Sequence, residues 1–156
     1  MTPTALSLPQ RAVRMYGNVA ATIDRLQPLF ALALRIYVAR VFFLSGLTKL
    51  HDWNITLALF QNEYHVHFLP PAVAAALGTC AELSLPILLL AGFGTRIAAA
   101  ALFGFNIVAT ISYTDLSDAG LKDHVLWGAL LLVTFIYGPG KLSLDHLFGR
   151  RFSGTE

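Results

Sequence analysis

Charged residues are scarce in this sequence. Of its 156 residues only 13% are Asp, Glu, Lys or Arg, whereas 56% are hydrophobic. A water-soluble domain carries about 25% charged residues, so water is the wrong solvent for most of this chain. The formal net charge of +2 is also too small to predict a nucleic-acid-binding surface.

Cysteine is nearly absent, because Cys80 is the only one in the chain. A single cysteine excludes an intramolecular disulfide and a C-x-x-C redox pair, so thiol exchange within this chain is excluded. The sequence also contains no nucleophile–base–orienter set, no phosphate-cradling glycine loop and no haem attachment motif. An autonomous hydrolase, kinase or cytochrome is therefore disfavoured.

Long apolar stretches are what the sequence has instead. A helix needs about 17–25 residues to cross the roughly 30 Å hydrocarbon core of a bilayer. Stretches near this length occur at residues 29–47, 72–91, 96–113 and 121–137. We therefore predict an all-α fold, a four-transmembrane-helix bundle solvated by the lipid bilayer. The predicted parts of the chain are an N-terminal segment (1–28), a membrane domain (29–140) and a tail (141–156).

Proline and glycine mark the ends of the apolar stretches. Pro70-Pro71 bars a helix before the second stretch, and the turn at residues 92–95 precedes the third. The second and third spans are thus predicted to form an antiparallel hairpin. Residues 138–140 (Gly-Pro-Gly) end the fourth span, and residues 55–60 predict a short interfacial helix in the first long loop.

Lysine and arginine predict the orientation of the bundle. They gather in the N-terminal segment, in the turn between the second and third spans, and in the tail. By the positive-inside rule these three regions face the cytoplasm, so both termini are predicted to be cytoplasmic. The residues concerned are Arg11, Arg14, Arg25, Arg96, Lys141, Arg150 and Arg151.

Three polar side chains fall near the centre of the predicted spans. At 1.5 Å per residue, Arg40, Glu82 and Asn106 lie about eleven residues into their spans. A lone charge at that depth costs at least about 2.5–3.5 kcal/mol on insertion scales, so such groups usually face the bundle interior and pair. We predict that Arg40 and Glu82 meet inside the bundle. The pair would either fix helix register or take part, with Asn106 and Lys49, in a proton relay or a quinone-headgroup clamp.

Two further basic residues lie nearer the span ends. Arg35 sits about two turns from the cytoplasmic end, where a long side chain can reach the headgroups without a partner, so it is predicted to be an anchor. Lys49 ends the first span at the outer interface. Its side chain is again expected to extend to the headgroups, and a role beside Glu82 is the alternative.

Histidines gather on the predicted outer face. In an extended loop, His65 and His67 would point their rings to one side, and His51 and His124 lie on the same face. This spacing suggests metal binding, although such a pair in a loop is more often solvated than ligated. Asp123 and His124 could instead cap the fourth helix, because Asp123 lies near its positive N-terminal end.

Several short motifs occur in a fixed order along the chain. They are FLSGLTK at 43–49, GTCAEL at 78–83, FN at 105–106, SY at 112–113, KDH at 122–124 and YGPG at 137–140. This order resembles the DoxX family of bacterial membrane proteins over about residues 35–147. The Gly-x-x-Lys end of the first span, combined with Glu82 in the second, is its most specific part. Arg40 departs from the pattern, because the family more often has an apolar residue there.

The resemblance implies a multi-pass protein of the bacterial inner membrane, described as a quinol-oxidase subunit or as the membrane partner in an oxidoreductase complex handling oxidative stress. It also implies a metal-stress setting beside peptide-modifying iron proteins and copper-binding peptides. Three classes of function stay open: a redox-linked subunit acting on or near a quinone, a copper-handling membrane protein, and a noncatalytic scaffold for a soluble partner. In each class the chain would work with a protein partner or as a homo-oligomer.

The candidate site residues fall into three groups by predicted role. The candidate catalytic residues are Glu82, Lys49, Asn106, Asp123 and His124. The candidate cofactor-binding residues are Arg40, Glu82, Asn106 and Tyr113, where Tyr113 is alternatively an aromatic anchor at the membrane surface. The candidate metal ligands are His51, His65, His67 and His124.

Overall fold

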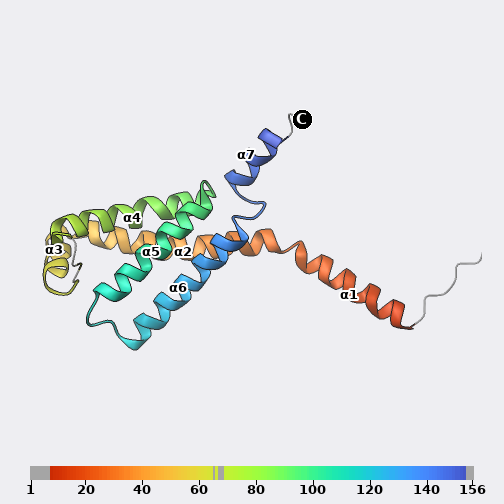
Figure 1. The fold of residues 1–156 in the computed structure, drawn as a ribbon, viewed down its shortest axis with the longest axis horizontal. Helices are drawn as coiled ribbons and strands as arrows, with labels where there is room; N and C mark the ends of the chain where they lie inside the picture. Colours follow the sequence, from red (N-terminus) through yellow and green to blue (C-terminus); the bar gives the residue numbers. More distant parts are fainter. Residues whose placement is uncertain (1–7, 65, 67–68, 154–156) are drawn as a thin grey trace, which may run out of the picture.

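The computed structural model describes residues 8–64, 66 and 69–153, and within them it is built of α-helices. Helices α2, α4, α5 and α6 pack into a bundle, α3 closes one end of it, and α1 and α7 lie at the opposite end (Figure 1). The helices of the described residues are α1 (Leu8–Asp24), α2 (Gln27–His51), α3 (Trp53–Asn62), α4 (Pro71–Ala91), α5 (Thr95–Ser112), α6 (Asp118–Tyr137) and α7 (Leu144–Ser153).

The predicted all-α fold with four membrane-crossing helices is confirmed. Four helical segments are long and apolar enough to cross a bilayer, the first of which joins α1 and α2. Helix α2 alone has 25 residues, and at 1.5 Å per residue it is about 37 Å long, which is enough to cross the hydrocarbon core. Helix α1 therefore extends beyond the bundle, as Figure 1 shows.

The predicted hairpin and the short loop helix are both present. Helix α4 begins directly after Pro70 and ends at Gly92, which adopts the left-handed conformation with φ of +72°. Helix α5 then starts three residues later. In the first long loop, Asp52 caps α3 by accepting a hydrogen bond of 3.0 Å from the backbone N–H of Ile55.

The bundle interior is packed with small and branched side chains. Five hydrophobic core positions of the described residues are 0% exposed, namely Ala75, Leu89, Ala99, Leu102 and Leu131. Alanine in such a core lets helices approach closely. The outer surface is also apolar, with Ile97 and Ile111 more than 70% exposed, as expected of a surface solvated by lipid.

Arg35 is buried inside the protein, so the prediction that it anchors the chain at the lipid headgroups is wrong. Its side chain is 1% exposed, and the guanidinium donates to the backbone carbonyls of Leu89 (3.4 Å), Leu90 (3.3 Å) and Leu142. The last carbonyls of a helix lack an intrahelical donor, and Arg35 satisfies those at the end of α4. Distance from the span end could not predict this, because the acceptors come from α4 and the tail.

Asp145 fastens the tail to the α4–α5 turn. Its Oδ1 accepts from the Gly94 backbone N–H at 2.8 Å, and its Oδ2 accepts from the N–H and the hydroxyl of Thr95, each at 2.8 Å. The Asp145 N–H donates in turn to the Gly92 carbonyl at 2.8 Å. A residue distant in sequence thus caps the N-terminus of α5.

The stability that the Asp145 contacts contribute depends on pH. Burial by itself would raise the pKa of Asp145, but the hydrogen bonds from Thr95 and Gly94 and the charge of Arg35 together hold it below its ordinary value. A carboxyl with a depressed pKa in the folded state contributes stability above its unfolded pKa, about 3.9. That contribution is lost as the pH falls from there through the folded pKa.

Asp145→Asn tests this linkage. At pH 7 the substitution is expected to lower the free energy of unfolding by about 1 kcal/mol, the usual size of a lost helix cap. The difference from the wild type should begin to shrink as the pH falls below about 4, because the wild-type carboxyl is then protonated in the unfolded state before it is protonated in the folded one. Unfolding in detergent micelles, followed by circular dichroism, measures both values. A difference that stays constant from pH 7 to 3 would contradict the proposed linkage.

Candidate functional site

A buried ion pair joins α2 to α4. The Lys49 ammonium lies 2.6 Å from Glu82 Oε2 and 2.7 Å from Oε1, and the two side chains are 15% and 6% exposed. Ser45 completes the cluster, because its hydroxyl donates to Glu82 Oε1 and accepts from Lys49 Nζ, each at 3.0 Å. All three donors of the ammonium and both oxygens of the carboxylate are therefore engaged.

Gly46 allows this pair to form. A Cβ at this position would lie 2.9 Å from the Leu83 side chain and 3.1 Å from Glu82 Cβ, closer than most side chains tolerate. Glycine lets α2 approach α4 at this point, and Lys49, nearly one turn farther along, can reach the carboxylate. This is the physical meaning of the Gly-x-x-Lys motif at the end of the first span.

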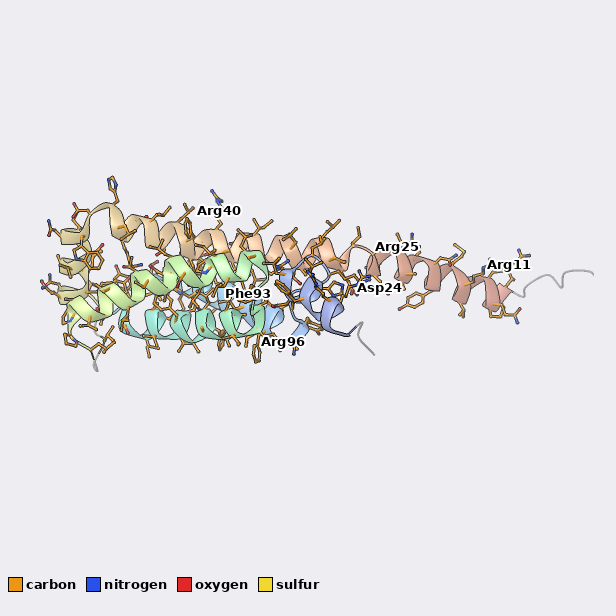
Figure 2. All side chains as sticks on the ribbon, turned by 90° about the horizontal axis from the view of Figure 1, so that it is seen from above. Arg11, Asp24, Arg25, Arg40, Phe93 and Arg96 are labelled. Atoms are coloured by element: carbon orange, nitrogen blue, oxygen red, sulfur yellow. The ribbon has the colours of Figure 1, made fainter. Side chains whose placement is uncertain are left out.

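The predicted pairing of Arg40 with Glu82 is wrong. Arg40 is exposed and its side chain projects away from the bundle (Figure 2). At 100° per residue, Arg40 lies about 140° around α2 from the buried Arg35, whereas Lys49 lies within about 40° of it. The prediction considered only depth in the membrane. Rotation about the helix axis directs Lys49 to the interior and Arg40 to the outer surface.

A polar cavity adjoins the ion pair on one side. It occupies about 270 Å³ between α2, α5 and α6, and its polar lining comes from Ser45, Lys49, Tyr64, Glu82, Tyr113, His124 and Trp127. The indole Nε1 of Trp127 is buried and has no hydrogen-bond partner among the described residues. A buried donor without an acceptor is costly, so this cavity suits water or another hydrogen-bond acceptor.

An apolar cavity adjoins the same pair on the other side. It occupies about 260 Å³ and is lined mainly by apolar residues of α3, α4 and α5, including Phe60, Leu77, Phe105 and Val108. The shared lining of the two cavities consists of Lys49, Tyr64, Glu82, Phe105 and Ala109. The ion pair thus stands between an apolar space and a polar one.

Asn106 and His124 form a second polar link, between α5 and α6. The Asn106 amide donates to the His124 backbone carbonyl at 2.9 Å, and its Oδ1 lies 2.7 Å from His124 Nδ1. An amide oxygen can only accept, so Nδ1 carries the proton in this contact. The His124 ring also meets Trp127 edge-on at 4.9 Å, which places it at the wall of the polar cavity.

Tyr64 and Tyr113 lie beside each other at the α3 end of the bundle. Their rings are 5.0 Å apart, and their backbones form an isolated antiparallel bridge. Burial, followed by the negative charge of Glu82, raises the pKa of Tyr64. A side-chain hydrogen bond with Glu63 raises the pKa of Tyr113. Both phenols therefore remain protonated at neutral pH, so each hydroxyl is able to donate a hydrogen bond.

The remaining predicted residues do not join this cluster. Asp123 and His51 are exposed, and His65 and His67 lie outside the described residues. Across residues 8–64, 66 and 69–153, no group of three or more His, Cys, Asp or Glu side chains is placed to hold a metal ion. Sequence reasoning missed Ser45 and Trp127, although the position of Ser45 four residues before Lys49 signals a shared helix face.

Comparison with known proteins identifies the family. The DoxX family model matches residues 30–115, the segment that holds Lys49, Glu82 and Asn106. The chain belongs to the DoxX family. A Haemophilus influenzae protein described as "Uncharacterized protein" is 33% identical over 124 residues, which cover 74% of this chain and 81% of the relative. No solved structure matches the chain. This DoxX-family chain is a multi-pass membrane protein with its polar cluster inside the bundle.

Proposed function

We propose that this DoxX-family protein binds the headgroup of a membrane quinone beside the Lys49–Glu82 pair, as a subunit of an oxidoreductase complex in the bacterial inner membrane. The supporting observation is the position of the pair between the two cavities. The apolar cavity is of a size to accept a substituted ring and is reached past apolar side chains, as a lipid-soluble ligand requires. Lys49 would then exchange its hydrogen bond to the Ser45 hydroxyl for one to a quinone carbonyl.

The polar cavity would supply the protons that quinone reduction requires. Reducing a quinone to a quinol takes two electrons and two protons, and the electrons would come from a partner redox protein. Protons would reach the ion pair through water in the polar cavity, next to His124, Tyr113 and the indole of Trp127. Lys49 and Glu82 would pass them to the quinone oxygens on the apolar side.

The positions of α1 and α7 support the proposal that both termini are cytoplasmic. Helices α1 and α7 both lie at the end of the bundle opposite α3 (Figure 1), and this end carries most of the arginine. By the positive-inside rule it would face the cytoplasm. Lys49, near the α3 end of α2, then lies near the outer face, as does the ion pair that we propose contacts the quinone.

Quinone content tests the proposal. The full chain would be purified in nanodiscs of native lipid, and extracted quinone quantified by chromatography. We expect about one quinone per wild-type chain above the content of the bulk lipid, and loss of this excess in the uncharged double variant Lys49→Met/Glu82→Gln. Ser84→Ala is the matched control, because Ser84 lies on α4 two residues from Glu82 but is exposed and bonds only within its own helix.

Two outcomes would overturn the proposal. One is a wild-type quinone content equal to that of the surrounding lipid. The other is an excess that the double variant retains while its circular dichroism matches that of the wild type. In either case the cavities beside the ion pair do not select a quinone.

A further inference from the structure

Helix α1 and the residue after it have one apolar face and one basic face. At 100° per residue, the large apolar side chains fall within about 160° of the helix circumference, and the three arginines fall within about 60° on the other side. The apolar residues are Leu8, Val13, Met15, Tyr16, Val19 and Ile23, and the arginines are Arg11, Arg14 and Arg25. This division is typical of a helix that lies in the plane of a membrane surface.

The apolar face of α1 is uncovered in the described part of the chain. Each of its large apolar side chains is more than half exposed, and no residue of α1 is buried against another described element. Helix α1 projects beyond the bundle, as Figure 1 shows. Its 17 residues span about 25 Å at 1.5 Å per residue. An apolar face of this length would stand in water if α1 continued away from the membrane.

The joint between α1 and α2 lies at the membrane surface. Arg35 bonds to the last carbonyls of α4, which marks the end of the membrane-crossing bundle. Gln27, the first residue of α2, precedes Arg35 by about 12 Å at 1.5 Å per residue. Between them, Leu29 and Phe30 are apolar and more than half exposed, as expected where lipid still surrounds α2. Lipid is therefore the apolar environment nearest to α1.

The helical hydrogen bonds are interrupted at this joint. Pro28 has no N–H, so it cannot donate to the Asp24 carbonyl four residues earlier. The Leu26 N–H donates to the Ile23 carbonyl, three residues back, at 2.9 Å, as in the tightened last turn of a helix. Helices change direction most readily at a proline. Helix α1 can therefore turn at the joint from the axis of α2 onto the membrane surface.

We propose that α1 lies on the membrane surface at its end of the bundle and binds anionic phospholipid. Its apolar face enters the boundary between headgroups and acyl chains, and Arg11, Arg14 and Arg25 pair with lipid phosphates. Asp24 is the only acidic residue among residues 8–25. A second copy of α1 would bring the same arginines without carboxylates to match them, so an anionic lipid surface is the more complementary partner.

This surface is separate from the proposed quinone site. No residue of α1 lines either of the cavities beside the Lys49–Glu82 pair. The inference depends on the membrane-spanning fold and on the position of the joint, and not on the identity of any ligand in the bundle. It would hold even if no quinone were found.

Spin labels on the full chain test the inference in lipid vesicles. Cys80 is replaced by serine, and a single labelled cysteine is introduced by Val19→Cys on the apolar face or by Asn18→Cys on the basic face. The vesicles contain phosphatidylcholine with or without phosphatidylglycerol. With phosphatidylglycerol present, we expect the label at position 19 to be accessible to oxygen and protected from a water-soluble nickel chelate. The label at position 18 should show the opposite.

Arg11→Gln/Arg14→Gln tests the contribution of charge. One basic residue near an anionic surface strengthens binding about fivefold. The ratio of surface-bound to free α1, obtained from the two components of the position-19 spectrum, should therefore fall about 25-fold when both arginines are replaced. Arg150→Gln/Arg151→Gln is the matched control. It removes two exposed arginines from α7, at the same end of the bundle, and should leave the ratio unchanged.

Three results would overturn the inference. In the first, the labels at positions 18 and 19 are equally accessible to the chelate in the anionic vesicles. In the second, the label at position 19 is equally protected with and without phosphatidylglycerol, so anionic lipid is not what α1 binds. In the third, protection is lost when the protein is diluted in lipid and the labels show spin–spin coupling before dilution, so a second copy covers the apolar face.

Discussion

Lys49→Met is expected to lower the free energy of unfolding by about 3–5 kcal/mol, the usual cost of leaving one member of a buried ion pair without its counter-charge. Glu82 is 5% exposed, and both of its carboxylate oxygens accept from Lys49. After the substitution only the hydroxyl of Ser45 would still donate to the carboxylate. Unfolding in mixed detergent micelles, monitored by circular dichroism, gives the loss directly.

The double variant Lys49→Met/Glu82→Gln separates charge from packing. It contains no buried charge at this position, so it should recover most of the stability that Lys49→Met loses. The single substitution Glu82→Gln should leave a buried ammonium that is easier to accommodate, because Lys49 lies near the end of α2 and is 15% exposed. If the double variant is as unstable as Lys49→Met, the ion pair is not the source of the effect.

Gly92→Ala is also expected to lower the free energy of unfolding substantially. Gly92 adopts φ of +72° at the end of α4, and a non-glycine residue in the left-handed region costs about 1–2 kcal/mol. A Cβ here would also lie 2.5 Å from the Ser143 side chain and 2.9 Å from the Ser143 Cα. The tail would have to move away, with the loss of the Arg35 and Asp145 contacts.

Gly94→Ala is the matched control for Gly92→Ala. Gly94 also has a positive φ, +57°, but a Cβ added there meets no heavy atom within 4 Å. Its replacement should therefore lower the free energy of unfolding only by the cost of a left-handed backbone at a non-glycine residue, about 1–2 kcal/mol. Equal losses for the two variants, measured by unfolding in the same micelles, would show that the tail does not pack against Gly92 in solution.

The sequence alone was enough to predict the fold class. Apolar runs of membrane-crossing length follow from composition, and their ends are set by local chemistry such as Pro70-Pro71 and the glycine turn after residue 91. These features depend on residues close together in the chain. For the same reason the short helix at residues 55–60 was predictable.

Pairing among the polar side chains was only partly predictable. Depth in the membrane correctly singled out Glu82 and Asn106 as residues that must turn inward, and both are buried. The choice of partner for Glu82 was wrong, because depth does not specify the rotation of α2. The two helices approach closely at Gly46. Lys49 follows three residues later and from there reaches Glu82.

The sequence by itself determined that this chain is a bundle of apolar helices with a few deep polar groups, because length, hydropathy and helix-ending residues act locally. Only the tertiary structure decided which of these groups meet. Contacts such as Lys49 with Glu82, His124 with Asn106 and Asp145 with Thr95 join residues 18 to 50 positions apart. They depend on how the helices are rotated and how closely they approach, and the exposed position of Arg40 follows from the same rotation.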